Sequence, residues 1–341
     1  MNENVYRQAG VDLAAAQNIK THIAALAHQT HGPEVIGAVG GFGALYELSR
    51  YNNPILVSST DGIGTKLRIA IMMDNYNGIG IDLVNACIND IIVCGADPLF
   101  FLDYLALESI STDIVTSIIS GISTACKESG CALIGGETAQ MPGIYTEGDF
   151  DMAGFVVGVV EKDNLITGSK IADGDMIIGL PSTGLHTNGY SLARHVLNVD
   201  NNPDILSTHH KDLGCTIGQA LLIPHPSYYK TLQPILNLAK GLVHITGGGL
   251  YENIPRILPK GLLARIDSST WKTPQIFSIL QDTGNISDQE MYNVFNMGLG
   301  MIIFCNPQDS EEIVSTLPDA LIVGEVIQTS ERNQVSICRS R

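Results

Sequence analysis

An apolar helical segment that carries carboxylates is the feature of this sequence most suggestive of chemistry. The segment GIDLVNACINDIIVCGADP spans 80–98, and nearly every residue from Leu83 to Cys94 is apolar. Four polar side chains interrupt the expected helix, residues 82–95: Asp82, Asn85, Asn89 and Asp90. At about 100° per residue the first three fall on one stripe of a helix, with Asp90 beside it. Because a buried carboxylate needs a partner, we expect Asp90 to be hydrogen-bonded, ion-paired or bound to a cation. A structural hydrogen-bond network is the alternative.

Two further carboxylates stand beside glycines at the expected ends of strands, Asp61 in STDGIGTK and Glu137 in GGETAQ. Together with Asp82 and Asp90 they belong to the first half of the chain and could converge at one end of its sheet. Mg²⁺ prefers oxygen ligands and often bridges carboxylates to phosphates. The sequence therefore predicts a metal-assisted polyphosphate site, with Lys66 as a direct phosphate contact.

Glycine is concentrated in five short clusters. The chain has 35 glycines in 341 residues, about one in ten, against roughly 7% in average proteins. The clusters are 37–44, 61–66, 135–143, 181–189 and 246–249. One cluster alone is more typical of a tight turn, but five clusters with polar neighbours favour backbone contacts to an anion. The P-loop motif, the dinucleotide G-x-G-x-x-G motif and the nucleophile elbow are all absent from the sequence.

Two of these clusters lie in the second half of the chain. HITGGGLYENIPR (244–256) places three glycines before an expected helix, a pattern typical of an anion site or of an ordinary entry turn. PSTGLHTNGYSL adds His186, Asn188 and Tyr190. His186 and His244 could donate hydrogen bonds or carry protons, although each alone is as typical of an ordinary polar residue. We expect His209 and His210 to lie at the surface.

Short β-rich runs alternate with helical patterns, which indicates an α/β architecture. In the first half we expect strands at 54–60, 99–107, 131–136 and 152–160, and helices at 82–95 and 111–129. The second of these helices has Ser111 and Thr112 as candidate N-caps and Gly130 just past its end. The polar stretch 161–175 predicts a boundary between two α/β domains, 1–165 and 166–341.

The second half continues the same pattern. The expected strands are 175–181, 262–267, 299–305 and 320–327. The expected helices are 189–199, 216–222, 227–240, 250–258, 273–283 and 288–295. The stretch 198–213 is typical of a surface excursion or a poorly ordered turn.

Composition excludes several classes of function. The chain has 19 Lys+Arg against 35 Asp+Glu, a net charge of −16, and no long basic run, so nucleic acid and anionic membranes are poor partners. No apolar stretch is long enough to span a bilayer, and no signal-peptide pattern begins the chain. Seven cysteines without a C-x-x-C pair are typical of buried, reduced thiols in a cytoplasmic protein.

The motifs resemble one enzyme family over nearly the whole chain. Residues 90–98 match D-x-x-x-x-G-A-x-P, a signature shared by aminoimidazole ribonucleotide synthetase, thiamine monophosphate kinase, selenophosphate synthetase and a hydrogenase maturation protein. Narrower matches are YRQAGVD (6–12), GGFGAL (40–45), TDGIGTKL (60–67), PLFFLDY (98–104), GGETAQMPG (135–143), HTNGYSL (186–192), HITGGG (244–249), ENIPR (252–256) and FNMGLGM (295–301). Their order and spacing resemble the phosphoribosylformylglycinamidine cyclo-ligase family.

The resemblance implies a reaction and a fold. That family closes the imidazole ring of purines, converting formylglycinamidine ribonucleotide and ATP to aminoimidazole ribonucleotide, ADP and phosphate through an iminophosphate. The implied fold is a two-domain α/β (α+β) fold. Its N-terminal sheet pairs across a homodimer into a barrel, with ATP near that interface, and its C-terminal domain has a mixed sheet with flanking helices.

The resemblance also assigns residues. The implied Mg²⁺ ligands are Asp61, Asp82, Asp90 and Glu137. The implied ATP contacts are Gly41, Phe42, Gly43, Asp61, Lys66, Asn89, Glu137 and Thr138. The implied substrate contacts are His186, Asn188, Thr246, Gly247, Gly248 and Gly249, and the implied catalytic residues are Asp90, His186 and His244. Leu185 and Gln140 depart from the common pattern and receive no role.

Two alternatives remain open at this stage. One is a sister enzyme that phosphorylates thiamine monophosphate or selenide, although no cysteine precedes Cys87 as a selenophosphate synthetase would require. The other is a nucleotide-binding protein without catalysis. Intact Asp61, Lys66, Asp90 and Glu137 argue against that second alternative.

Overall fold

The computed structural model describes residues 13–37, 39–109 and 111–339. The motif at 6–12 lies outside them. The chain forms two compact units, which we call unit 1 and unit 2. Unit 1 comprises Met1–Ile91 and Asp97–Glu161, and unit 2 comprises Ile92–Ala96 and Lys162–Arg341. The sequence predicts the boundary between the two domains at residue 165, close to the boundary between Glu161 and Lys162 in the structure.

Unit 1 is built on a four-stranded sheet with the strand order β3-β6-β4-β5. Its strands are β3 (Pro54–Gly62), β4 (Asp97–Leu107), β5 (Ala132–Gln140) and β6 (Phe150–Glu161). Strand β6 pairs antiparallel with both β3 and β4, whereas β4 and β5 are parallel. A two-stranded hairpin, β1 (Val35–Ile36) and β2 (Leu45–Tyr46), precedes this sheet.

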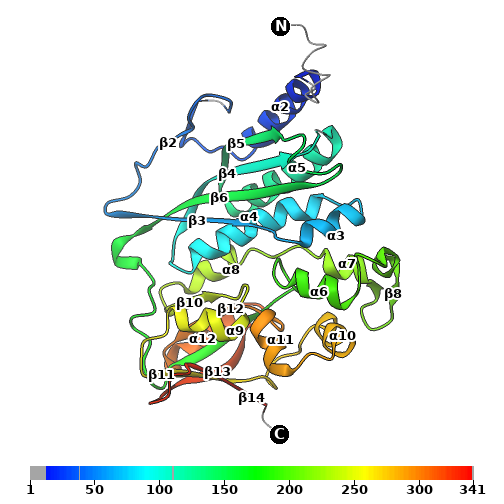
Figure 1. Ribbon diagram of the computed structural model, residues 1–341. Helices are drawn as coiled ribbons and strands as arrows, with labels where there is room; N and C mark the ends of the chain where they lie inside the picture. The colour runs from blue at the N-terminus through cyan, green and yellow to red at the C-terminus, as the bar shows by residue number, and fades with distance from the viewer. Residues whose placement is uncertain (1–12, 38, 110, 340–341) are drawn as a thin grey trace. The chain divides into compact units, whose positions relative to one another are not determined.

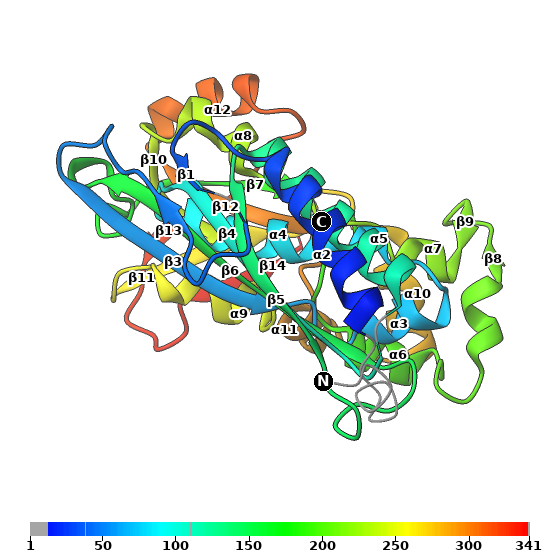
Figure 2. The same ribbon diagram turned by 90° about the horizontal axis from the view of Figure 1, so that it is seen from above.

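Helices pack on one face of this sheet. They are α2 (Leu13–His28), α3 (Lys66–Met72), α4 (Asn77–Ile92) and α5 (Thr112–Ser129). Helix α4 lies against β6, because a Cβ on Gly154 would come within 3.1 Å of Leu83 and Cys87. Helices α4 and α5 approach so closely that a Cβ on Gly80 would lie 2.1 Å from the Ile118 carbonyl oxygen. Helix α2 packs against α5 (Figure 2).

Unit 2 contains a mixed six-stranded sheet with the order β10-β12-β7-β13-β11-β14. Its strands are β7 (Met176–Pro181), β10 (Ala239–His244), β11 (Leu262–Asp267), β12 (Leu299–Cys305), β13 (Leu321–Gln328) and β14 (Val335–Cys338). All neighbours are antiparallel except β11 and β14. The expected mixed sheet is therefore confirmed.

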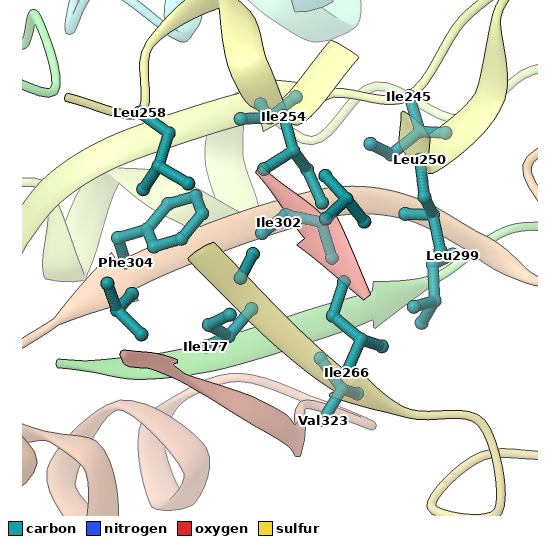
Figure 3. Close-up of a cluster of buried hydrophobic side chains, with 14 of the residues drawn as sticks. Ile177, Ile245, Leu250, Ile254, Leu258, Ile266, Leu299, Ile302, Phe304 and Val323 are labelled. Atoms are coloured by element: carbon teal, nitrogen blue, oxygen red, sulfur yellow. The ribbon is translucent and has the colours of Figure 1, made fainter. Parts of the chain in front are cut away.

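Short helices make up much of the rest of unit 2. They are α6 (Tyr190–Val196), α7 (Ile217–Leu221), α8 (Tyr229–Leu232), α9 (Gly249–Asn253), α10 (Gln275–Gly284), α11 (Asp288–Val294) and α12 (Ser310–Thr316). Figure 3 shows apolar side chains of β7, β11, β12 and β13 packed with Leu250 and Ile254 into one core. This burial holds the loops at the ends of β7 and β10 in place.

Several expected elements differ from the structure. The helix expected at 227–240 is wrong: α8 ends at Leu232, a 3₁₀ turn covers Gln233–Ile235, and β10 begins at Ala239. Pro234 removes one backbone donor, and pairing of β10 with β12 satisfies the strand instead. Helices α2, α3 and α12 and strand β14 were not expected. The stretch 198–213 contains a 3₁₀ helix, Pro203–Ser207, and the strand β8 (His209–His210), which pairs with β9 (Cys215–Thr216).

The sequence predicts no segment that spans a membrane. Among residues 13–37, 39–109 and 111–339, the helices are too short or too polar to cross a bilayer.

Candidate functional sites in the two units

Asp61 and Asp90 are brought together where the end of β3 meets α4. The Ser59 hydroxyl on β3 donates to Asp90 Oδ2 at 3.0 Å, and Asp61 follows two residues later along the same strand. Both charges act on Cys87, one turn before Asp90, and burial together with Asp61 raises the pKa of that thiol. Asp61 is exposed and Asp90 is half-buried. These two carboxylates are therefore candidates to bind one cation together.

Lys66 and Asp82 form an ion pair inside unit 1. Lys66 Nζ lies 2.7 Å from Asp82 Oδ2, and both side chains are 0% exposed. Burial lowers the pKa of Lys66, and the charge of Asp82 opposes that shift. The structure thus places the ammonium group against a carboxylate in the interior. This geometry supports a positioning role for both residues, since Asp82 lies two turns before Asp90 on α4.

The predicted polar stripe of α4 faces the interior. Asn85 is 4% exposed, and Asn89, like Asp82, is 0% exposed. The apolar residues around them predict a helix buried on most sides, and the burial of these three side chains agrees with that prediction. The contact of Asn89 with ATP remains a prediction.

Glu137 lies apart from the other three carboxylates. On β5 it is paired in register with Tyr104, whereas Asp61 on β3 is paired with Gly154, and β3 and β5 are opposite edges of the sheet. Three strand spacings separate these edges by about 14 Å. The register also determines which face of the sheet each side chain occupies. Gly154 and the residues paired with it on the adjacent strands face α4, whereas Tyr104 and Glu137 are exposed on the opposite face.

The four carboxylates predicted to bind a metal ion therefore do not lie together in the described part of the chain. In that part, no group of three or more His, Cys, Asp or Glu side chains is arranged to hold a metal ion by itself. Asp61 with Asp90 is the pair that the fold supplies. Mg²⁺ commonly takes one or two carboxylates and completes its shell with substrate phosphates and water, so the pair fits that ion when a polyphosphate is bound.

The glycine loop between β1 and β2 is exposed. Gly41, Phe42 and Gly43 lie at the surface, and Phe42 projects fully into solvent. Thr138 is half-buried on β5. Nucleotide contacts for this loop and for Thr138 stay predictions.

Asp103 is a buried carboxyl group that sequence reasoning missed. It lies on the helix-covered face of β4 and is 8% exposed. Gly136 makes room for it, because a Cβ there would lie 2.3 Å from Asp103 Oδ1. Burial, together with the charge of Glu137, raises the pKa of Asp103 from 3.8 to about 7. The only signal was a single acidic residue within the apolar strand PLFFLDYLAL.

This shift predicts a pH-dependent stability. Between pH 3.8 and about 7 the folded protein retains a proton that the unfolded chain releases, so Asp103 contributes stability that is present below pH 3.8 and is lost as the pH rises to about 7. The loss is at most about 4 kcal/mol, since one pKa unit corresponds to about 1.4 kcal/mol. Asp103→Asn should abolish this decline when the free energy of unfolding is measured by urea titration from pH 4 to 8.

The matched control is Asp151→Asn, which removes an exposed carboxylate from β6 of the same sheet. Its stability curve should run parallel to that of the wild type. Parallel curves for Asp103→Asn and the wild type would show instead that Asp103 ionises normally in the folded protein.

In unit 2, the loop after β7 is fixed by Asn296. Asn296 Oδ1 accepts from the Ser182 hydroxyl at 2.8 Å and from the Gly298 N–H at 2.9 Å, and its Nδ2 donates to the Gly184 carbonyl at 2.8 Å. Asn296 is 3% exposed. His186, in the middle of this loop, is buried and has φ of 61°, a left-handed conformation uncommon for a residue other than glycine.

The glycine loop after β10 is organised by Asn253. Its Nδ2 donates to the carbonyl oxygens of Gly249 at 2.8 Å, Gly247 at 3.2 Å and Thr246 at 3.3 Å. The Thr246 hydroxyl donates to Asn253 Oδ1 at 3.2 Å. Because this amide holds the carbonyls inward, the turn is rigid. Helix α9 has five residues, so the expected contribution of a helix dipole is small, and an anion would depend on the loop itself.

The two loops of unit 2 meet. A Cβ on Gly247 would lie 3.3 Å from Asn188 Oδ1, so the loop 181–189 touches the loop 246–249. The structure thus brings together all the residues expected to bind the substrate in unit 2: His186, Asn188, His244, Thr246, Gly247, Gly248 and Gly249. Asn188, Thr246 and Gly248 are half-buried and Gly247 is exposed.

A third histidine that sequence reasoning missed joins this group. His225, between α7 and α8, stacks on His186 with ring centroids 4.0 Å apart. Its Nε2 lies 3.1 Å from Nε2 of His244. The sequence around it, LLIPHPSYY, has no spacing that signals a site.

Comparison with known proteins places both units in one family. Residues 43–160 match the AIR synthase related protein, N-terminal domain, and residues 172–335 match its C-terminal domain. A phosphoribosylformylglycinamidine cyclo-ligase of Thermoanaerobacter pseudethanolicus is 46% identical over 329 residues, covering 95% of this chain and 98% of that protein. One from Neisseria meningitidis serogroup C is 48% identical over 315 residues, covering 92% and 91%.

Solved structures with the same fold are more distant in sequence. The thiamine-monophosphate kinase of Stenotrophomonas maltophilia has a TM-score of 0.65 at 15% identity, covering 96% of both chains. The hydrogenase maturation protein HypE of E. coli has a TM-score of 0.66 at 16% identity, covering 94% of this chain and 93% of that one. A HypE structure in complex with ATP has a TM-score of 0.63 at 15% identity, covering 92% and 88%. These likenesses show the fold.

Proposed function

The chain belongs to the AIR synthase related protein family and, within it, to the phosphoribosylformylglycinamidine cyclo-ligases, and from this membership we propose its reaction and the roles of its residues. The protein closes the imidazole ring of formylglycinamidine ribonucleotide at the expense of ATP, giving aminoimidazole ribonucleotide, ADP and phosphate. The observation that carries this proposal is the identity of 46–48% with cyclo-ligases across both units.

The chemistry requires activation of a poor leaving group. The formyl oxygen attacks the γ-phosphate of ATP, ADP departs, and the amide becomes an iminophosphate. The amidine nitrogen then attacks the formyl carbon, and the oxygen leaves as phosphate. Positioning of the two reactants and neutralisation of phosphate charge account for most of the catalysis in such transfers.

Unit 1 is proposed to bind ATP and Mg²⁺. Asp61 and Asp90 would hold the ion together with the phosphates, and Mg²⁺ would supply neutralisation of the developing charge. Asp82 is held by Lys66, so both would act by fixing α4 beneath Asp90. The ATP complex of a HypE protein with the same fold supports the choice of nucleotide.

Unit 2 is proposed to bind the ribonucleotide. The meeting of the loops 181–189 and 246–249 gives a rigid turn with an exposed glycine, Gly247, beside the amide of Asn188. Such a turn suits the phosphate of the substrate, because backbone N–H groups can approach an anion closely. His186 and His244 would lie at its reacting end.

A homodimer through unit 1 is also proposed. The face of the sheet opposite α4 exposes large apolar side chains: Leu56 at 60%, Tyr104 at 42% and Phe155 at 40%. An uncovered patch of this kind favours a partner, and a second copy pairing its sheet into a barrel would cover it. Glu137 shares this face, so it would lie at the interface. Light scattering that shows a monomer at micromolar concentration would contradict the proposal.

The compartment follows from the thiols. None of the seven cysteines, all of which lie in the described residues, forms a disulfide bond, which fits a reducing compartment, and we place the protein in the cytoplasm.

The deciding experiment is an assay of the purified protein with ATP, Mg²⁺ and formylglycinamidine ribonucleotide. We expect aminoimidazole ribonucleotide and ADP in equal amounts. Thiamine monophosphate is the competing acceptor. Phosphorylation of it without formation of aminoimidazole ribonucleotide would assign the protein to the sister kinases instead.

A further inference from the structure

Three buried imidazoles lie in a row in unit 2. His186 belongs to the loop after β7, His225 to the segment between α7 and α8, and His244 to the end of β10. They are 1%, 0% and 6% exposed. The ring centroids of His186 and His225 are 4.0 Å apart with 20° between the planes, and those of His225 and His244 are 5.1 Å apart. His225 is therefore the middle member.

The contact between His225 and His244 shares a proton. Their Nε2 atoms are 3.1 Å apart, a hydrogen-bond distance. In such a contact one nitrogen must donate and the other must accept, so the tautomer of one ring decides that of the other. His244 cannot change its state at Nε2 without a matching change in His225.

The position of the proton on His186 is set from its own loop. The Thr183 N–H donates to His186 Nε2 at 3.2 Å. This nitrogen therefore carries a lone pair, and the proton of the neutral ring belongs on Nδ1. His186 is thus held neutral while its face lies on His225.

The stacking limits the charge of the row. Two imidazolium rings 4.0 Å apart in the interior would repel each other strongly, so His186 and His225 are not both charged. Tyr228, whose ring centroid is 6.4 Å from that of His186, is the other titratable group among the ring contacts. Its hydroxyl donates to the Pro181 carbonyl at 2.7 Å, and burial raises its pKa, so it stays neutral.

The surrounding fold clears space for this arrangement. A Cβ on Gly300 of β12 would lie 1.9 Å from the Tyr228 hydroxyl oxygen and 2.7 Å from His186 Cε1. Burying polar groups is costly unless they pair with one another. If these side chains served packing alone, apolar side chains would fill the space at lower cost, and the pairing of the His225 and His244 nitrogens would not be needed.

We propose that His225 is a positioning residue that stacks on His186 and shares a proton with His244, so that it fixes the ring orientation of the first and the tautomer of the second. This inference rests on the proposed function, because it concerns the two histidines assigned to the reacting end of the substrate. His225 touches neither substrate nor ATP in this scheme. It acts through its two neighbours.

Kinetics of His225→Phe test the role of the nitrogens, because phenylalanine keeps a flat ring for stacking and removes the hydrogen bond. We expect kcat to fall roughly tenfold or more, since positioned proton transfer contributes on the order of 10²–10⁴, and the KM for ATP to stay within threefold. The control is His209→Phe at an exposed histidine of the same unit, with unchanged kinetics. A kcat for His225→Phe within threefold of the wild type would overturn the proposal.

A measurement on the wild type decides the case if His225→Phe fails to fold. Side-chain ¹⁵N spectra of the full chain report which nitrogen of each histidine is protonated. We expect one Nε2–H and one bare Nε2 in the pair His225 and His244, and a bare Nε2 in His186. Two bare or two protonated Nε2 atoms in the pair would contradict proton sharing. Absence of ring closure by the wild type would reject the proposed function and leave this spectroscopic test standing.

Discussion

Asp90→Asn is expected to lower kcat on the order of 10²–10³-fold while leaving the fold intact, a loss comparable to that of one charge-stabilising group in other active sites. Asparagine has the same shape, and its carbonyl oxygen can still accept the hydrogen bond that the Ser59 hydroxyl makes at 3.0 Å. What it lacks is the negative charge. If Asp90 and Asp61 hold Mg²⁺ and the phosphates of ATP, that charge is the property that matters.

The measurement is the steady-state rate at saturating ATP and ribonucleotide, with the melting temperature recorded for the same preparation. Raising the Mg²⁺ concentration should recover part of the activity, because a weakened site fills at higher metal concentration. Asp113→Asn is the matched control, since it removes an exposed carboxylate from the first turn of α5 in the same unit. A folded Asp90→Asn variant with near-normal turnover would remove Asp90 from the metal site.

The helices that the sequence predicted well have local signals at both ends. Helix α5 was expected at 111–129 and spans Thr112–Ser129, with Gly130 at its end in the left-handed conformation at φ of 66°. The sequence also placed the strands 262–267 and 299–305 correctly. Strand β10 is absent from the predicted strands, and its first two residues fall in the helix predicted at 227–240. Its apolar residues suit either structure, and pairing with β12, which decides the outcome, is not a local property.

The candidate sites show the same limit of prediction from sequence: contacts between distant residues have no local signal. Spacing along α4 predicted that Asp82, Asn85 and Asn89 share one stripe of a largely apolar helix, and all three side chains are buried. Spacing could not show that the partner of Asp82 is Lys66, because α3 was not predicted and the contact is tertiary. Asp103 and His225 were missed for a related reason. Each is a single polar residue in an apolar or proline-flanked stretch, and only the fold reveals its neighbours.

Lys66→Met is expected to destabilise unit 1 by about 3–5 kcal/mol, because removing one partner of a buried ion pair leaves the other charge uncompensated. Methionine matches the aliphatic length of lysine, so the loss is electrostatic rather than steric. Asp82 would remain in the interior, where both side chains are 0% exposed, without the ammonium group that lies 2.7 Å away. The free energy of unfolding from urea titration measures the effect.

Two further variants separate this cause from others. The double variant Lys66→Met with Asp82→Leu should recover most of the stability, because a well-packed apolar pair often replaces a buried ion pair at little cost. Arg68→Met is the matched control on the same helix. Arg68 Nη1 pairs with Asp149 Oδ1 at 2.6 Å, with side chains 41% and 35% exposed, and such exposed pairs contribute about 0.2–1 kcal/mol.

The comparison of stability with activity then assigns the role of Lys66. A positioning role predicts that the double variant folds and retains measurable turnover, since neither side chain reaches the nucleotide from its buried place. A direct phosphate contact predicts the reverse: Lys66→Met would unfold at nearly the wild-type urea concentration, and ATP affinity would be lost in the single and double variants alike. The positioning role changes the stability to urea, whereas direct contact with phosphate changes the affinity for ATP. The three variants therefore distinguish a buried ion pair that positions α4 from a lysine that binds ATP.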